Sequence, residues 1–197
     1  MSKILIASQN AHKIEEIAPV LLAAGFEVTD ARMHKLPEPV EDSGSFIGNA
    51  RIKASAAAKA TGMAVLADDS GLVMESLANE FPGVESAPYA AECGGYPAAV
   101  ADIFKRLEGK SSRCYYVCYI IVYFPDGREI IVNGRVYGHL IETPRGSGIF
   151  GFDPWFQIEG TAFDGKTFTE ITNEDKHTIS HRGSALKELL DELRALS

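Results

Sequence analysis

The chain has 197 residues, 46% of them hydrophobic, and carries a formal net charge of −8 at pH 7. This length and composition suit a globular protein with a buried core, whereas the acidic balance argues against polynucleotide binding, which needs a basic surface. No apolar run reaches the roughly 18 residues of a membrane-spanning helix, so we expect no membrane partner. A small anionic substrate is compatible with the charge, because a few local cations suffice to hold it.

Two further features bear on where the protein works. The first residues, Met1-Ser2-Lys3-Ile4, lead directly into an apolar run, with no basic leader and no small-residue cleavage site. The cysteines Cys93, Cys114 and Cys118 are odd in number and show no CxxC spacing, which predicts neither a disulfide framework nor a zinc site. We therefore expect a cytoplasmic location.

Strands and helices alternate along the hydrophobic pattern, which indicates one α/β unit over residues 1–197. Apolar and β-branched runs predict strands at Ile4–Ala7, Phe26–Asp30, Met63–Ala67, Leu72–Ser76, Cys114–Phe124 and Glu129–Tyr137. A glycine-rich loop over Arg145–Pro154 leads to Trp155–Ile158. Helical spacing and capping residues predict helices after Lys13, over Phe46–Ala60, over Pro97–Leu107, after Thr172 and from Leu186 onward. We expect Pro19 to kink the first helix. We expect Glu80–Gly95 to be irregular, because it is rich in proline and glycine.

The predicted strand at Met63–Ala67 is followed by Asp68-Asp69-Ser70-Gly71, which contains the first candidate site. Two carboxylates at the end of a buried strand can hold a hard cation such as Mg²⁺. One of them can also accept a proton from an attacking water. A simple turn is the alternative, because Asp, Ser and Gly are common turn residues.

Ser8-Gln9-Asn10-Ala11-His12-Lys13 connects the first predicted strand to the first helix. The free N–H groups and the dipole at a helix start favour an anion, and Ser8, Asn10 and Lys13 can add donors. The segment contains no glycine, so it is neither a Walker loop nor a GxGxxG loop. The alternative is an ordinary N-cap followed by a solvated lysine.

A second cation and a further carboxylate lie near the predicted helix at Phe46–Ala60. Asn49 and Lys53 are four residues apart and share one face of that helix. Glu41 precedes the helix and can join the Asp68-Asp69 pair at a metal ion. The alternatives are a surface lysine for Lys53 and a solvated loop residue for Glu41.

Candidate base-binding residues lie in the C-terminal third of the chain. Phe150-Gly151-Phe152-Asp153 combines rings on which a base can stack with a carboxylate that can accept a hydrogen bond from a ring N–H. Lys176, His181 and Arg182 precede the last helix, and cationic donors suit a keto oxygen but not an exocyclic amine. The alternatives are a core-packed aromatic pair with Asp153 in a turn, a capping role for His181, and a surface ion pair for Arg182.

Six short motifs occur in one order along the chain. They are Ser8-x-Asn10-x-x-Lys13, Phe46-x-x-Asn49-Ala50-x-x-Lys53-Ala54, Ala67-Asp68-Asp69-Ser70-Gly71-Leu72, Phe81-Pro82-Gly83-Val84, Phe150-Gly151-Phe152-Asp153-Pro154 and Ile179-Ser180-His181-Arg182-Gly183. With this order and spacing, the chain resembles the inosine triphosphate pyrophosphatase family, also described as the dITP/XTP diphosphatases, over essentially its full length. Each motif is weak alone, but six in sequence form a specific signal.

The resemblance implies a two-lobed α/β fold, with a long mixed central β-sheet flanked by helices around one cleft, and a homodimer. It also implies Mg²⁺-dependent hydrolysis of ITP, dITP or XTP to the monophosphate and pyrophosphate. By this resemblance Ser8–Lys13 would bind phosphates, and Asp69 would bind metal with Glu41 and accept the proton. Asp68 is a further candidate ligand, and which aspartate takes which role stays open. Lys13 and Lys53 would be catalytic, by stabilising the charge that builds in the transition state. The other implied substrate contacts are Asn49, Ser70, Phe150, Gly151, Phe152, Asp153, Lys176, His181 and Arg182.

The chain departs from the family pattern at three places. Gly48 stands where the family often has Glu, and Ile149 and Phe152 replace a glycine and a tyrosine. Glu85-Ser86-Ala87-Pro88 replaces a segment that commonly reads Tyr-Ser-Ala-Arg. These changes bear on substrate range and rate more than on reaction type, because the cation donors and the aspartate pair are retained.

Three other functions are compatible with parts of the sequence. One is a pyrophosphatase for modified pyrimidine or methylated nucleotides, and another is a sensor that binds a triphosphate without cutting it. The third is a phosphatase of the haloacid dehalogenase type, but that class places an aspartate after the first strand, where this chain has Ser8-Gln9-Asn10. Pyrophosphate release from ITP with Mg²⁺ separates hydrolysis from binding alone.

Overall fold

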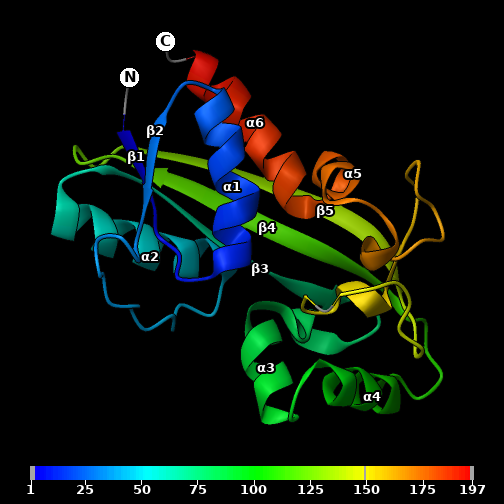
Figure 1. Ribbon diagram of the computed structural model, residues 1–197. Coiled ribbons are helices and arrows are strands. Elements are labelled where there is room, and N and C mark those ends of the chain that lie inside the picture. The colour runs from blue at the N-terminus through cyan, green and yellow to red at the C-terminus, as the bar shows by residue number, and fades with distance from the viewer. Residues whose placement is uncertain (1–2, 149, 196–197) are drawn as a thin grey trace. The chain divides into compact units, whose positions relative to one another are not determined.

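The computed structural model describes residues 3–148 and 150–195, which form an α/β fold around a mixed six-stranded sheet (Figure 1). The strand order is β2-β1-β3-β4-β5-β6. The strands are β1 (Lys3–Ile6), β2 (Glu27–Asp30), β3 (Ala64–Met74), β4 (Arg113–Tyr123), β5 (Glu129–Leu140) and β6 (Phe156–Ile158). The helices are α1 (Ala11–Ala23), α2 (Phe46–Thr61), α3 (Ser86–Glu92), α4 (Tyr96–Leu107), α5 (Asn173–Ile179) and α6 (His181–Ala195). The predicted α/β class and mixed sheet are confirmed, since β1 pairs in parallel and β5 pairs antiparallel with β6.

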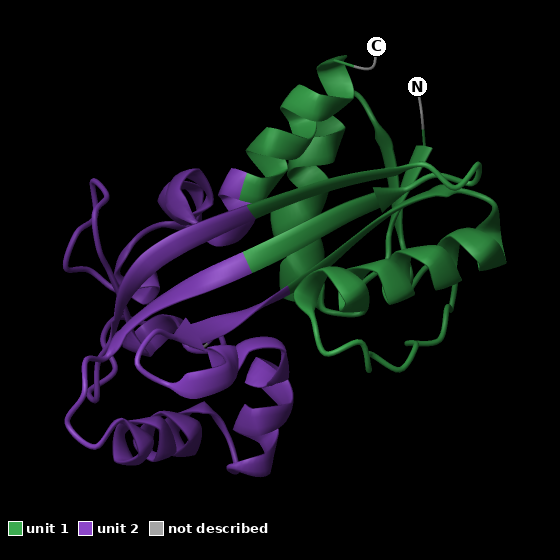
Figure 2. Cartoon of the chain, turned by 180° about the vertical axis from the view of Figure 1, so that it is seen from behind, with its two compact units in different colours: residues 1–69, 118–133, 185–197 green, residues 70–117, 134–184 purple. Residues whose placement is uncertain are grey.

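The chain divides into two compact units (Figure 2). Unit 1 contains Met1–Asp69, Cys118–Asn133 and Ala185–Ser197, and unit 2 contains Ser70–Val117 and Gly134–Ser184. The boundaries fall inside β3, β4 and β5, so each of these long strands contributes residues to both units. The arrangement of two lobes around one cleft stays a prediction.

In unit 1, β1 pairs in parallel with β2 on one side and with β3 on the other. The chain runs from β1 through α1 to β2 and then through α2 to β3. Right-handed crossovers in these two directions place the helices on opposite faces of the sheet (Figure 1). The core on the α1 and α6 face contains Ile4, Ile6, Ile14, Ile17, Leu66, Leu186 and Leu189. The core on the α2 face contains Leu5, Ala7, Ala50, Ala54, Val65 and Ala67.

The ends of α1 and α2 follow from capping residues in the sequence. Asn10 caps α1, because its side chain accepts hydrogen bonds from the N–H groups of His12 and Lys13. The helix continues through Pro19 to Ala23. Ser45 caps α2 by accepting from the N–H of Gly48, and Gly62 ends the helix in the left-handed conformation. The predicted cap at Ser45 is confirmed.

The prediction of a turn between two strands at Asp68-Asp69-Ser70-Gly71 is wrong, because β3 continues through this segment from Ala64 to Met74. Turn residues are tolerated here because the two carboxylates form ion pairs and hydrogen bonds within the fold. Consecutive strand residues alternate between the faces of a sheet. Asp68 and Asp69 therefore point to opposite faces rather than side by side.

Unit 2 has its own core, built around the neighbouring strands β4 and β5 and the helices α3 and α4. It contains Leu72, Met74, Tyr89, Val100, Ile103, Tyr116, Val136, Phe152, Trp155 and Phe156. The prediction of an irregular segment over Glu80–Gly95 is wrong for Ser86–Glu92, which form α3. Pro88 does not break this helix because it lies in the first turn, where an N–H has no partner within the helix.

The C-terminal elements follow the predictions except at the start of the last helix. α6 begins at His181 rather than near Leu186, so the prediction that His181 and Arg182 precede this helix is wrong. Ser180 starts the helix early, because its Oγ accepts a hydrogen bond from the N–H of Gly183. A turn over Phe124–Arg128 joins β4 to β5, and Phe124 donates its N–H to the carbonyl of Arg128. Thr172 caps α5 by accepting from the N–H of Asp175. Cys93, Cys114 and Cys118 are free thiols. Among the helices of residues 3–148 and 150–195, none is both long and apolar enough to cross a membrane.

Candidate functional site

The first group of site residues lies in unit 1, where the chain leaves β1 and where β3 carries its two aspartates. The crossovers from β1 and into β3 run on opposite faces of the sheet, so this place is a topological switch point. Ligands of open α/β sheets bind at such points, beyond the carboxyl ends of the strands. The fold therefore brings Ser8–Lys13 and the Asp68-Asp69 pair to the part of the sheet that favours ligand binding.

Hydrogen bonds hold the Ser8–Lys13 segment in one conformation. Ser8 Oγ accepts from the N–H of Asn10, and Gln9 Nε2 donates to the carbonyl of Leu36 at 2.8 Å. Asn10 occupies two first-turn N–H groups of α1 as its N-cap. His12 is exposed beside Glu15. The predicted N-cap is thus present, and an anion binding here would meet donors that Asn10 already engages.

Lys13 is not the solvated lysine that the simplest alternative predicts. Its Nζ lies 3.1 Å from Asp68 Oδ2, and the Asp68 side chain is only 1% exposed. The thiol of Cys118 also faces this oxygen, with Sγ 3.8 Å from Oδ2. The pair lies on the face of the sheet covered by α1 and α6. Asp68 therefore holds a cation next to the start of α1.

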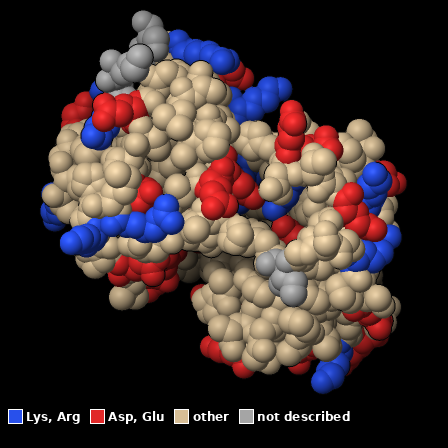
Figure 3. All heavy atoms as spheres, in the orientation of Figure 1, with Lys and Arg blue, Asp and Glu red and all other residues tan. Residues whose placement is uncertain are grey.

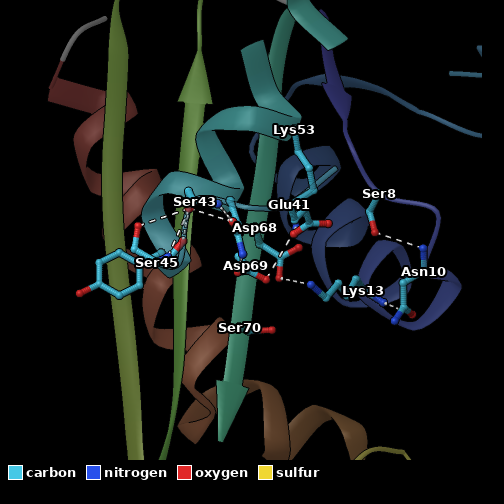
Figure 4. A network of polar contacts seen from close by, with 12 residues as sticks. Ser8, Asn10, Lys13, Glu41, Ser43, Ser45, Lys53, Asp68, Asp69 and Ser70 are labelled. Atoms are coloured by element: carbon cyan, nitrogen blue, oxygen red, sulfur yellow. Dashed lines mark hydrogen bonds and ion pairs between the residues drawn. The ribbon is translucent and has the colours of Figure 1, made fainter. Parts of the chain in front are cut away.

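On the opposite face, Asp69 belongs to a cluster with residues of α2 and the segment before it (Figure 4). Asn49 Nδ2 donates to Asp69 Oδ2 at 3.2 Å. Lys53 Nζ lies 3.7 Å from Asp69 Oδ1 and 2.7 Å from Glu41 Oε2. The predicted shared face of Asn49 and Lys53 is confirmed, because both side chains reach the same aspartate. Glu41 and Lys53 are partners rather than separately solvated residues.

The electrostatics of this cluster suit proton transfer near neutral pH. Burial is the largest effect on Asp69 and raises its pKa to about 6, against the lowering effect of Lys53 and Lys13. Burial alone would lower the pKa of Lys53, but the carboxylates of Asp69, Asp68 and Glu41 outweigh it and the pKa is raised. Asp69 can therefore exchange a proton close to neutral pH while Lys53 stays a cation.

The donor set fits a magnesium ion through Glu41 and Asp69. Their carboxylate oxygens face the same ammonium of Lys53, so one cation already lies between them. Within residues 3–148 and 150–195, no three His, Cys, Asp or Glu side chains gather as a metal-binding group. Two carboxylates are enough for Mg²⁺, which typically takes one or two carboxylates together with substrate phosphates and water. Asp68 points to the other face, and its role as a ligand stays a prediction.

Sequence reasoning missed Ser43, which adjoins this cluster. Its Oγ lies 2.8 Å from Asn49 Oδ1, and its backbone N–H donates to the same oxygen at 3.2 Å. A Cβ added at Gly48 would collide with the side chain of Ser43. The glycine at position 48 is thus the signal that could have indicated a close neighbour above the first turn of α2.

The second group of site residues lies in unit 2. Arg182 is 2% exposed and donates from Nη2 to Ser70 Oγ at 2.9 Å. The alternative of a surface ion pair for Arg182 is therefore wrong. Lys176 Nζ lies 2.7 Å from Asp153 Oδ2, and both side chains are largely buried. Lys176 also lies 5.3 Å from the centre of the Phe150 ring. The structure thus brings Phe150, Asp153 and Lys176 together.

Two aromatic residues differ from the prediction for the base-binding group: Phe152 lies in the core, and Tyr116 packs against His181. Phe152 is 2% exposed and packs edge-on against Tyr96, with ring centres 4.9 Å apart, so its ring is a core residue. This matches the core-packing alternative. Tyr116 was not expected from the sequence, yet its ring stacks on His181 at 4.8 Å with an interplanar angle of 12°. Ile149 lies outside the described residues.

The surface seen in Figure 3 carries both acidic and basic side chains. On the face seen in Figure 3, acidic and basic side chains are interspersed rather than gathered into one basic surface. A polynucleotide backbone binds through an extended basic surface. The cations discussed above are instead individual side chains, each held by a carboxylate or a hydroxyl group of its own unit.

Comparisons with known proteins agree along the length of the chain. A model of the Ham1 family matches residues 4–192. The curated dITP/XTP pyrophosphatase of Zymomonas mobilis is 42% identical over 192 residues, which are 95% of this chain and 90% of that protein. The dITP/XTP pyrophosphatase of Corynebacterium efficiens is 39% identical over 209 residues and covers 99% of each chain.

Solved structures show the same similarity in three dimensions. The structure of a HAM1 protein from Coxiella burnetii superposes with a TM-score of 0.88 at 32% sequence identity. This superposition covers 99% of the present chain and 100% of the Coxiella chain. The similarity therefore extends over both compact units.

Proposed function

Because the chain belongs to the Ham1 family, and because Lys53 joins Glu41 and Asp69 in one cluster, we propose that it hydrolyses purine nucleoside triphosphates that are not standard precursors. The substrates are dITP, XTP and ITP, and the products are the nucleoside monophosphate and pyrophosphate. This membership confirms the family resemblance of the six motifs. The reaction removes unusual nucleotides from the precursor pool.

Lys13 and Lys53 bind the triphosphate. Each already pairs with a buried carboxylate, Lys13 with Asp68 and Lys53 with Asp69, so their positions are set before substrate arrives. Cations fixed in advance stabilise the negative charge that develops on the phosphate oxygens, with little reorganisation during the reaction. The Ser8 hydroxyl and the Asn10 side-chain amide add neutral donors near Lys13.

Asp69 accepts the proton from the attacking water. Its Oδ2 receives a hydrogen bond from Asn49, and its Oδ1 faces Lys53. The water oxygen forms a bond to the phosphorus next to the ribose, and the bond from that phosphorus to the bridging oxygen breaks. Pyrophosphate leaves with the electron pair of the broken bond. A pKa of about 6 keeps most of Asp69 deprotonated at pH 7 and above.

Glu41 and Asp69 would hold a magnesium ion when substrate is bound. Mg²⁺ supplies neutralisation of the phosphate oxygens and polarisation of the reacting phosphoryl group. The support for this assignment is the donor set, since both carboxylates converge on the Lys53 ammonium. Lys53 holds the two carboxylates near each other when no metal ion is bound.

The residues of unit 2 recognise the base. Lys176 and Arg182 donate hydrogen bonds to keto oxygens, which hypoxanthine and xanthine carry where adenine has an amine. Asp153, held by Lys176, accepts a hydrogen bond from a ring N–H of the base. Phe150 offers a ring face beside Lys176. Contacts of Gly151, Ser70, Asn49 and His181 with the substrate stay predictions, as do the homodimer and the cytoplasmic location.

A nucleotide panel with Mg²⁺ tests this proposal. The panel contains dITP, XTP, ITP, ATP, GTP, a modified pyrimidine triphosphate and a methylated purine triphosphate, and the readout is pyrophosphate release. We expect dITP, ITP and XTP, whose bases carry a keto oxygen at the 6-position and no exocyclic amine, to be cleaved fastest, and ATP to be cleaved slowly. Faster cleavage of the modified nucleotides would assign the chain to the alternative substrate class. Binding of dITP without pyrophosphate would support the sensor instead.

A further inference from the structure

Asn49 is a buried amide whose orientation is fixed from both ends. It is 4% exposed and lies in the first turns of α2. Its Nδ2 donates to Asp69 Oδ2, while its Oδ1 accepts from the backbone N–H and the hydroxyl of Ser43. A flipped amide would place Nδ2 against the Ser43 N–H and Oδ1 against the Asp69 carboxylate. Both contacts would be repulsive, so the network selects one orientation.

Ser43 reaches Asn49 only because residue 48 is glycine. A Cβ at position 48 would lie 2.6 Å from Ser43 Cβ and 2.7 Å from Ser45 Oγ, and closer still to Ser43 Oγ. Ser43 Oγ also lies 3.0 Å from the carbonyl of Ser45 and accepts from the N–H of that residue at 3.2 Å. The Ser43–Ser45 segment is therefore folded tightly onto the first turn of α2 (Figure 4).

The hydrogen bond from Asn49 gives the two carboxylate oxygens of Asp69 different partners. Oδ2 accepts a hydrogen bond from the Asn49 amide, whereas Oδ1 faces the ammonium of Lys53, which also pairs with Glu41. If the Asp69 carboxylate could rotate, Oδ1 and Oδ2 would exchange partners. Catalysis slows when the oxygen that accepts the proton is out of place. The hydrogen bonds from Ser43 to Asn49 Oδ1 fix the Asn49 amide, and the fixed amide prevents this rotation of the Asp69 carboxylate.

We propose that Ser43 is a positioning residue of the active site: through Asn49 it fixes the Asp69 carboxylate, and Gly48 provides the space for it. This inference rests on the proposed function for its catalytic consequence. The hydrogen bonds of Ser43 go to Asn49 and Ser45 rather than to Asp69. The effect of Ser43 on Asp69 passes through the side-chain amide of Asn49.

The kinetic test uses Ser43→Ala, Gly48→Ala and Ser43→Thr, with Ser45→Ala as the matched control. Ser45 lies on the same segment and caps the same helix, but it is not a donor to Asn49. For dITP with saturating Mg²⁺, we expect Ser43→Ala to lower kcat about threefold to tenfold with little change in KM, the effect of one lost hydrogen bond. We expect Gly48→Ala to lower kcat at least as much and Ser43→Thr to retain kcat. Ser45→Ala lowers Tm and leaves kcat within about twofold.

A double-mutant cycle establishes whether the effect passes through Asn49. In the Asn49→Ala background, the Ser43→Ala change should alter kcat less than about twofold, because the intermediate group is already gone. An unchanged kcat in Ser43→Ala, or an equal loss with and without Asn49, would overturn the inference.

A second readout does not depend on catalysis. In protein labelled with ¹⁵N-asparagine, the Asn49 side-chain amide is assigned by its loss in Asn49→Ala, and its exchange with water is measured. Ser43→Ala and Gly48→Ala should shift this resonance and speed its exchange, whereas Ser45→Ala should not. If the wild type cleaves no nucleotide, the proposed function fails and the amide signal still decides the role of Ser43. An amide signal that is unchanged in Ser43→Ala refutes that role whatever the activity.

Discussion

Asp68 and Asp69 are consecutive residues of β3, yet their carboxylates face opposite sides of the sheet. Asp68 meets Lys13 on the face covered by α1 and α6. Asp69 meets Asn49 and Lys53 on the face covered by α2. One dipeptide therefore holds a lysine on each side of the sheet, and Asp69 shares its lysine with a second carboxylate, that of Glu41.

The raised pKa of Asp69 predicts a pH-dependent cost to stability. Burial raises the pKa of folded Asp69 to about 6, whereas in the unfolded chain this carboxyl has its usual pKa of 3.8. Stability from this group is therefore complete below the unfolded pKa and is lost as pH rises through about 6. Asp69→Asn, measured by urea unfolding with EDTA, should gain stability over the wild type at pH 8 and gain less at pH 4. An equal difference at both pH values contradicts the raised pKa.

The ion pair between Lys13 and Asp68 predicts a strong effect on folding. Lys13→Met leaves the buried Asp68 carboxylate without its ammonium partner, and we expect the free energy of unfolding to fall by about 3 kcal/mol at pH 8. Adding Asp68→Asn should recover part of this loss, because the uncompensated charge is removed. Lys3→Met is the matched control, since the pair of Lys3 with Glu27 is exposed. A Lys13→Met protein as stable as this control would show that the buried pair carries no net stability.

The carboxylate of Glu41 predicts the magnesium dependence. Glu41→Gln removes one charged donor while leaving the side chain the same length, so the Mg²⁺ concentration for half-maximal rate should rise at least about tenfold. Removal of metal with EDTA should stop hydrolysis in the wild type. Glu38→Gln, an exposed residue of the same segment, is the control. An unchanged Mg²⁺ requirement in Glu41→Gln would exclude Glu41 as a ligand.

The contact between Lys176 and Asp153 predicts the base preference. Lys176→Met removes a donor for a keto oxygen, so kcat/KM for XTP should fall about tenfold to a hundredfold while that for ATP changes little. The ratio of kcat/KM for XTP to kcat/KM for ATP should therefore fall by the same factor. Lys166→Met, an exposed lysine of the same unit, should change neither value. If both nucleotides lose the same factor in Lys176→Met, the lysine supports the fold rather than reading the base.

Sequence patterns predicted the helices and strands where periodicity and caps agree. The caps at Asn10, Ser45 and Thr172 were readable because a short polar side chain precedes each helix. The continuation of β3 through Asp68-Asp69-Ser70-Gly71 was not readable, because local turn chemistry is overridden by ion pairs with Lys13 and Lys53, which come from distant segments.

The candidate site was predictable in its residue types and only partly in its contacts. The six motifs selected the cations and carboxylates that the fold groups within each unit. They did not reveal that Phe152 is a core ring, that Arg182 is buried, or that Ser43 lies behind Asn49. The burial of a side chain, and the residues that contact a site residue from outside the site, depend on packing between segments far apart in the chain. No short sequence pattern encodes such packing.

The release of pyrophosphate from dITP by the wild type and by Asp69→Asn, measured side by side at pH 8 with Mg²⁺, tests the central claim most directly. Circular dichroism of both proteins checks that the fold is retained, and Asp191→Asn, an exposed aspartate of α6, is the control. The account predicts one pyrophosphate per dITP, no free orthophosphate, and a rate in Asp69→Asn lower by about a hundredfold to ten-thousandfold. Orthophosphate as the product, or wild-type turnover by a folded Asp69→Asn protein, would contradict it.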